Sequence, residues 1–264
     1  MRVTFLGTGT SHGIPVIGCD CPVCRSNNPR NKRLRPSVFV ENGSQSLLVD
    51  ATPDFRAQAL RANISRVDAV LMTHTHADHV LGLDDLRVFS MRSGQKIPIY
   101  GSAHSIESIQ RVFPYACTDT PAWPGLPSFA LHTVQPHQTF DVSGTAIRAL
   151  PLLHGRMTVL GFLIGRDLAY VTDCKPVSAD VIEAVRGVTV LVLDALRPRE
   201  HPTHLTIAEA RDVAEQVGAK LTLFTHLCHE AEHEAVEKEL PPHVRVAYDE
   251  MQIEVTDGAV RQIV

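Results

Sequence analysis

The sequence concentrates metal-binding side chains in one short stretch, Thr73 to His79 (THTHADH). Imidazole and carboxylate groups bind zinc, manganese or iron while leaving coordination positions open. His74 and His76 lie two residues apart, so both can face one ion from an extended turn. Asp78 and His79 follow after the chain bends and can reach a second ion beside the first. The stretch therefore predicts a metal centre; the alternative is a polar loop whose histidines only cap a strand.

A second group of metal-binding side chains comes earlier in the chain. Cys19, Cys21 and Cys24 have the spacing C-x-C-x2-C, which can wrap one tetrahedral zinc ion and leave one vertex for a ligand from elsewhere. The surrounding residues show little periodicity, and a metal clip would order such a segment. The alternative to a metal clip is three unlinked thiols. Disulfides between them are not expected, because a reducing compartment disfavours disulfides.

Apolar runs that read as strands precede the candidate ligands. The run Val67 to Met72 leads directly into the histidine-rich stretch. Four more predicted strands end next to a polar residue of the same kind: His154, Asp173, Asp194 and His226. Side chains at strand ends suit a rigid scaffold that carries its functional loops at one edge.

The remaining elements follow from turn and cap signals. Asn42-Gly43 predicts a hairpin between strands at 37–41 and 46–50. Asp54 is a candidate N-cap for a helix over 55–62, and Thr206 with Glu209 forms a candidate capping box for another. Strands and helices alternate in both halves, so the expected fold class is α/β (α+β), with two sheets face to face and helices outside.

The bulk composition limits the possible functions. The chain has 264 residues, 44% hydrophobic residues and a net charge of −4. No run reaches the about 18–20 apolar residues of a membrane span, and the first residues do not form a signal peptide, so we expect a cytoplasmic protein. The negative charge makes a nucleic-acid partner unlikely, although the basic run Arg25 to Arg35 could attract an anion.

The motif His74-x-His76-x-Asp78-His79 resembles the metal motif of the metallo-β-lactamase fold superfamily. The resemblance implies a four-layer αββα sandwich formed by one domain, 1–264, with a cysteine-rich zinc-clip insertion at about 18–35. It also implies two divalent active-site ions, Mn²⁺ or Zn²⁺ and possibly Fe. The ligands that it implies are His74, His76 and His154 for one ion, Asp78, His79 and His226 for the other, and Asp173 between them.

Two ions about 3.5–4 Å apart hold a hydroxide at neutral pH and stabilise attacking and leaving oxygens, so the expected chemistry is hydrolysis. The cysteine clip, with a histidine three residues after His226, resembles the phosphoribosyl 1,2-cyclic phosphate phosphodiesterase family of bacterial phosphonate breakdown. We expect His229 to complete a structural zinc site, with Cys228 as the competitor.

The same resemblance implies catalytic roles for His204 and Asp78, and Asp194 is a candidate to orient a ligand histidine from behind. The expected substrate is a small anionic phosphodiester, most simply a 5-phosphoribosyl 1,2-cyclic phosphate, and a homodimer is possible. A lactonase or thioesterase, a tRNA 3′-processing-like nuclease, and a non-catalytic metal- or RNA-binding module are the alternatives.

Overall fold

Two β-sheets pack face to face in the computed structural model, which describes residues 1–118 and 125–263. Among these residues the first sheet has eight strands in the order β15-β14-β1-β2-β3-β4-β5-β6 and the second has seven in the order β13-β12-β11-β10-β9-β8-β7. The first sheet consists of β1 Arg2–Gly7, β2 Ser37–Asn42, β3 Gln45–Val49, β4 Ala69–Leu71, β5 Ile97–Gly101, β6 Phe129–Thr133, β14 Gln252–Thr256 and β15 Ala259–Gln262. The second consists of β7 Thr139–Val142, β8 Thr145–His154, β9 Met157–Ile164, β10 Leu168–Val171, β11 Val190–Asp194, β12 Leu221–Thr225 and β13 Val244–Val246.

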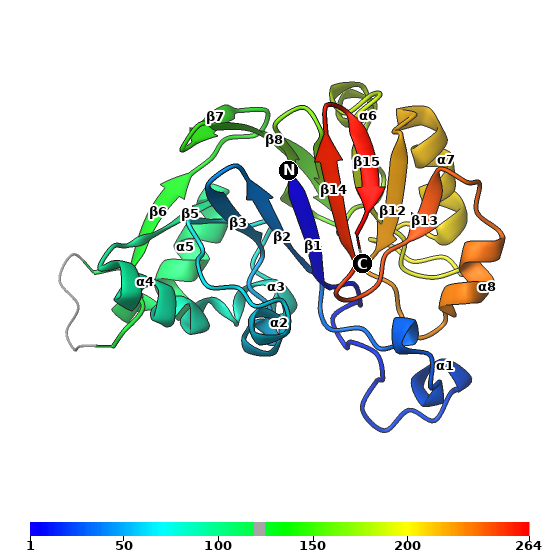
Figure 1. The fold of residues 1–264 in the computed structure, drawn as a ribbon, viewed down its shortest axis with the longest axis horizontal. Helices are drawn as coiled ribbons and strands as arrows, with labels where there is room; N and C mark the ends of the chain where they lie inside the picture. The colour runs from blue at the N-terminus through cyan, green and yellow to red at the C-terminus, as the bar shows by residue number, and fades with distance from the viewer. Residues whose placement is uncertain (119–124, 264) are drawn as a thin grey trace.

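Helices cover the outer face of each sheet (Figure 1). Those beside the first sheet are α2 Phe55–Arg61, α3 Ala77–Val80, α4 Arg87–Ser93 and α5 Ala103–Val112, and those beside the second are α6 Ala179–Ala184, α7 Ile207–Val217 and α8 His233–Lys238. Short helical turns are α1 Pro22–Arg25, η1 Pro29–Asn31, η2 Leu83–Leu86 and η3 Pro114–Ala116. The predicted αββα sandwich is confirmed.

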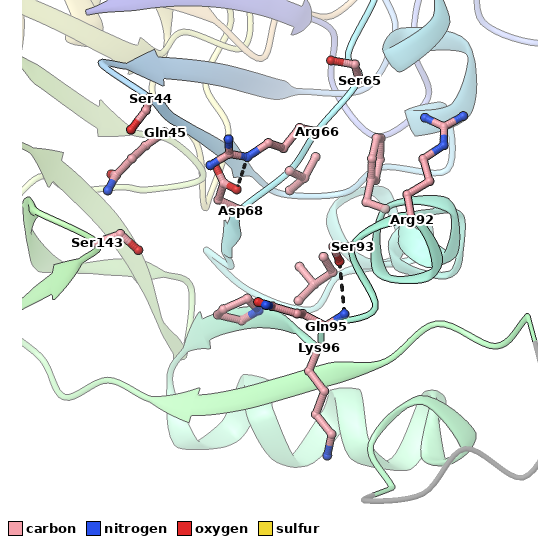
Figure 2. A pocket seen from close by; sticks show the side chains of 14 residues that line it. Ser44, Gln45, Ser65, Arg66, Asp68, Arg92, Ser93, Gln95, Lys96 and Ser143 are labelled. Atoms are coloured by element: carbon pink, nitrogen blue, oxygen red, sulfur yellow. Dashed lines mark hydrogen bonds and ion pairs between the residues drawn. The ribbon is translucent and has the colours of Figure 1, made fainter.

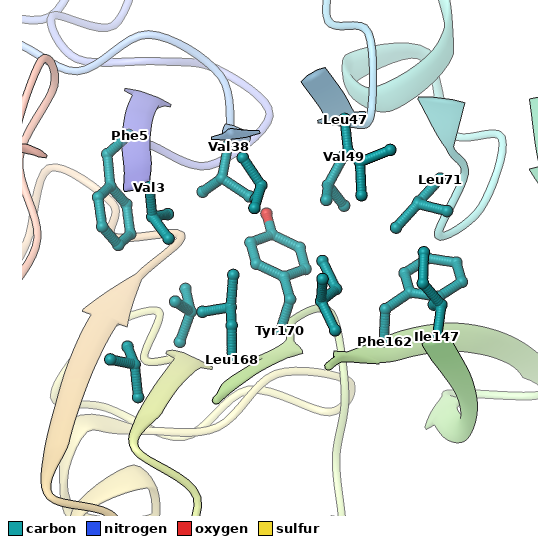
Figure 3. Packing of buried hydrophobic residues seen from close by; sticks show 14 of the residues in the cluster. Val3, Phe5, Val38, Leu47, Val49, Leu71, Ile147, Phe162, Leu168 and Tyr170 are labelled. Carbon is teal, nitrogen blue, oxygen red and sulfur yellow. The ribbon is translucent and has the colours of Figure 1, made fainter. Parts of the chain in front are cut away.

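Alternation along the strands produces the layers. Leu47 and Val49 of β3 point into the core between the sheets, whereas Leu48 packs outward against the helices. Figure 3 shows the inner layer, where Phe162 and Tyr170 of the second sheet face side chains of the first. Because both faces of the central strands are buried, these strands read as continuous apolar runs rather than as alternating ones.

Most predicted elements are present, with corrections at their ends. Asp54 precedes α2 but makes no side-chain cap; its carboxylate instead accepts from the Arg35 N–H (3.0 Å) and Nη1 (2.9 Å). The predicted hairpin β2–β3 and the Thr206–Glu209 capping box are confirmed.

The clip segment projects from one edge of the sandwich, where α1 is drawn (Figure 1). A bridge between Ile14 and Arg33 closes its base. The basic residues of this segment differ in burial: Arg33 is fully buried, whereas Arg25 is exposed and pairs with the exposed Asp20. The expectation that the run attracts an anion stays a prediction.

No helix among the described residues has the length and apolar character that a bilayer crossing requires.

Candidate active site

The sandwich brings the predicted ligands to one edge, where strands of both sheets end. His74, His76, Asp78 and His79 follow β4 of the first sheet. The others follow or end strands of the second sheet: His154 at β8, Asp173 after β10, Asp194 at β11 and His226 after β12. Residues separated by up to 152 positions, from 74 to 226, thus share one site because parallel strands end on the same side.

One group of side chains consists of His74, His76 and His154, with one ligand atom from each within 4.8 Å of the others. The ring centroids of His74 and His76 lie 4.5 Å apart, and His76 lies 5.2 Å from His154. His74 and His154 are buried, whereas His76 is exposed. A cation bound here would be held on one side by the protein and open to a substrate on the other.

A second group consists of Asp78, His79 and His226, again within 4.8 Å. Asp173 lies beside both groups: its Oδ1 is 3.2 Å from His226 Nε2 of the second group, and its carboxylate lies within 4.8 Å of a ring nitrogen of His74 of the first. Asp173 is thus near both predicted cation positions, and its role as a ligand between them stays a prediction.

Two of these residues have unusual backbone conformations. Asp173 and His226 have positive φ angles of 56° and 62°. Such angles are uncommon for residues other than glycine and mark sharp turns at functional sites. Here they let a strand end with its polar side chain directed into the shared edge.

Asp50, which sequence reasoning missed as a site residue, fixes the histidine-rich turn from behind. Its buried carboxylate accepts from the Thr73 N–H (2.8 Å) and Oγ1 (2.7 Å) and contacts His79 Nδ1 at 2.7 Å. Since Nδ1 donates to this carboxylate, His79 presents Nε2 to the site. Asp50 ends the predicted strand 46–50, so the strand-end pattern could have identified it.

The donor set fits a divalent cation. The buried Nε2 atom of His74 has no hydrogen-bond partner among the described residues, and a buried polar atom of this kind is costly unless something binds it. The buried Nε2 atoms of His79 and His226 make no well-aligned hydrogen bond there and lie 3.2–3.6 Å from carboxylate oxygens. Burial alone would lower the pKa of His79, but Asp173 and Asp50 raise it well above its ordinary value. Burial would raise the pKa of Asp173, yet His226 and His79 hold it well below. The carboxylates of the site thus stabilise positive charge there, and a divalent cation can supply that charge.

His204 lies against the two metal-binding groups. Its Nδ1 is 2.9 Å from Asp194 Oδ2, and its ring centroid lies 4.9 Å from that of His154 and 4.8 Å from that of His226. Asp194 was expected to orient a ligand histidine; the structure pairs it with His204 and places its Oδ1 3.9 Å from His226 Nδ1. Nδ1–H of His204 therefore donates to Asp194 and leaves Nε2 for chemistry.

The structure places His229 beside the three cysteines of the clip. His229 Nδ1 lies 3.2 Å from Cys19 Sγ and 3.6 Å from Sγ of both Cys21 and Cys24. The Cys24 N–H lowers the pKa of Cys21 to about 6, which favours the thiolate that binds zinc. The competitor Cys228 lies outside this group, and its Sγ accepts from the Glu230 N–H.

The clip and the catalytic edge share one turn. His226 and His229 are three residues apart, and Leu227 between them is held by hydrogen bonds from the Thr10 N–H to its carbonyl and from its N–H to Thr8 O, each 3.0 Å. A zinc ion in the clip would anchor this turn and so help to position His226.

Comparison with known proteins agrees with this geometry. The family described as the β-lactamase superfamily domain matches residues 45–227, a range that includes every predicted active-site ligand. A crystal structure of a diphosphatase from the PhnP family has a TM-score of 0.89 and 39% identity, covering 97% of this chain and 98% of that one.

Two further proteins are similar. Zn²⁺-bound PqqB from Methylobacterium extorquens has a TM-score of 0.76 and 22% identity over 97% of this chain and 100% of that one, a likeness that shows the fold. An octanoyltransferase from Porphyromonas gingivalis is 38% identical over 99% of this chain. The chain spans about half of that protein's length, 53%.

Proposed function

We propose that the chain, which belongs to the β-lactamase superfamily and, within it, to the PhnP family, is a metal-dependent hydrolase that cleaves a small phosphodiester. The simplest substrate is a 5-phosphoribosyl 1,2-cyclic phosphate. Two observations support a phosphoester: the similarity to a diphosphatase over almost the whole chain, and a histidine beside the metal-binding groups that can protonate a leaving oxygen. We infer two divalent cations, Mn²⁺, Zn²⁺ or Fe²⁺, as the cofactors.

The observation that carries the proposal is the His204–Asp194 pair. In this proposal the cations would be held by His74, His76, His154, Asp78, His79, His226 and Asp173. When bound, the metal pair supplies an activated water and neutralises charge on the phosphoryl oxygens.

The chain's own groups provide the remaining functions. Nε2 of His204 would donate its proton to the leaving oxygen as the P–O bond breaks, while Asp194 stabilises the charged ring and keeps its orientation. The exposed edge of His76 marks the side from which a substrate approaches. The structure gives Asp78 a place in the second group, so we propose its role as that of a ligand rather than of a separate acid or base.

The test is a substrate panel assayed with Mn²⁺ and with Zn²⁺. We expect hydrolysis of cyclic ribose phosphates and of bis(p-nitrophenyl) phosphate, with lactones and thioesters much slower, and loss of turnover in His76→Ala. Leaving-group chemistry sharpens the assignment: His204→Ala should lose about 10²–10⁴-fold on a sugar leaving group, and less on p-nitrophenolate, which needs no proton.

Faster cleavage of lactones or thioesters than of every phosphodiester would contradict the proposal and favour the esterase alternative. The acyl-transfer activity named for the P. gingivalis protein belongs to a chain about twice as long, and the matched half gives no separate support for it here.

A further inference from the structure

A cavity of about 560 Å³ lies at the opposite ends of β4 and β5 from the candidate active site. Residues that precede these two strands line it, whereas the metal-binding residues follow β4. Figure 2 shows its lining, which draws on the β2–β3 turn, the segment before β4, the end of α4 and the β7–β8 turn. Its volume suits a small metabolite.

The charged side chains of this distal cavity are mainly cationic. Arg66, Arg92 and Lys96 line it, against one carboxylate, Asp68. That carboxylate is already engaged, because it accepts from Arg66 Nε and, at 2.8 Å, from the Ser46 N–H. Arg66 and Asp68 offset one another, and Arg92 adds a positive charge to the lining, although the whole chain is negative.

A buried amide adds donors to this charge. Gln45 is only 8% exposed, and its Oε1 accepts from Thr145 Oγ1 at 2.8 Å. Its Nε2 makes no hydrogen bond to another described residue and is not one of the fully buried unpaired atoms, so it is accessible from the cavity. In Figure 2 the amide lies between Ser44 and Ser143 at one end of the lining, where its N–H groups can donate to an acceptor.

The floor of the cavity is apolar. Val67, Phe89 and Ile97 are each at most 6% exposed, and they lie beneath the charged and hydroxyl groups together with Pro98. This combination suits a ligand with one strongly acidic end and a less polar body, since the donors can bind oxygens while the floor contacts carbon.

We propose that the distal cavity binds a phosphate monoester of a small metabolite, with Gln45 Nε2, the Arg66 guanidinium and the Ser44 and Ser143 hydroxyls as donors to the phosphate. Guanidinium, amide and hydroxyl groups from different segments match the several acceptor oxygens of a phosphate better than the two of a carboxylate. This site goes beyond the proposed hydrolysis, since it shares no residue with the metal-binding groups.

The test is isothermal titration of the metal-loaded enzyme with inorganic phosphate and with ribose 5-phosphate. Because phosphate also binds metal centres, we expect two binding events. Arg66→Gln and Gln45→Ala should each weaken one event at least about tenfold, as expected for the loss of a charge-assisted or buried hydrogen bond. The same event should persist in His76→Ala, which removes a side chain of the candidate active site.

The matched control is Arg186→Gln. Arg186 is also an exposed arginine paired with a carboxylate, Glu183 Oε2 at 2.8 Å, and it does not line the cavity. This variant has the same change in net charge and should bind phosphate like the wild type. A single binding event that disappears in His76→Ala and is unchanged in Arg66→Gln and Gln45→Ala would overturn the proposal, provided that all variants keep the wild-type melting temperature.

Discussion

His204 is the side chain on which the proposed chemistry depends, and its neighbour Asp194 determines which nitrogen it offers. Asp194 is completely buried at the end of β11 and approaches His204 Nδ1 at 2.9 Å. Its other oxygen faces His226. One carboxylate thus serves both the candidate proton donor and a candidate metal ligand, so it should be a positioning residue rather than a catalytic one.

We predict that Asp194→Asn lowers kcat about 10²–10⁴-fold while KM changes little. The neutral amide cannot stabilise the positively charged ring that donates the proton, and an amide N–H that donates to Nδ1 excludes the doubly protonated form of His204. The measurement is steady-state kinetics across pH, with metal content determined on the same sample. A fall in bound metal matching the fall in kcat would instead assign Asp194 to metal retention.

At the scale of elements, the clip and β12 are joined through the turn from Thr225 to Glu230. His229 connects this turn to the cysteines of the clip, and Thr8 and Thr10 hold Leu227, the residue next to a candidate ligand, from the loop after β1.

We predict that Cys21→Ser loses one tightly held zinc and leaves the active-site pair only partly occupied, because a hydroxyl binds zinc far more weakly than a thiolate. Metal analysis after dialysis is the measurement. Cys117→Ser is the control, since Cys117 is a half-buried thiol outside the clip. Equal zinc content in both variants would show that the clip cysteines are ordinary thiols.

The strand ends could be read from the sequence, because buried strands appear as apolar runs and the polar residue after each is conspicuous. The role of Asp50 could not, because its contact with His79 depends on β3 and β4 lying side by side, a fact of tertiary structure. The prediction that Asp54 caps α2 was wrong for the same kind of reason: Arg35, distant in sequence, competes for its carboxylate.

The ligand roles, the single-domain organisation and the homodimer stay predictions.

At the scale of the whole molecule, buried polar contacts connect the clip base to the C-terminal part of the chain. Arg33 Nη1 donates to Thr8 Oγ1 (2.7 Å) and Ala247 O (2.6 Å), and its Nη2 lies 3.0 Å from Nδ1 of His233 in α8. Because Arg33 only donates, His233 accepts through Nδ1 and is required in its neutral form.

Stability should therefore fall in mild acid. Burial, aided by Arg33, lowers the pKa of His233 to about 4, whereas the unfolded chain has about 6.5. Between these values only the unfolded state takes up the proton, so the free energy of unfolding should decrease as pH falls from about 6.5 towards 4. The expected loss from this residue between pH 7 and pH 5 is about 2 kcal/mol.

Urea unfolding at both pH values is the measurement, with His233→Gln as the comparison because glutamine keeps an acceptor and does not titrate here. The variant should lose less stability between pH 7 and pH 5 than the wild type. Equal losses would mean that other groups cause the acid sensitivity.

The place of β1 in the first sheet also governs the order in which the protein can be assembled in the cell. β1 pairs with β2 on one side and with β14 on the other. The ribosome makes β1 before β14, so the nascent chain keeps one edge of β1 open until β14 has emerged. His226 is translated after all the other candidate ligands, so cation capture by the full set must follow translation through His226.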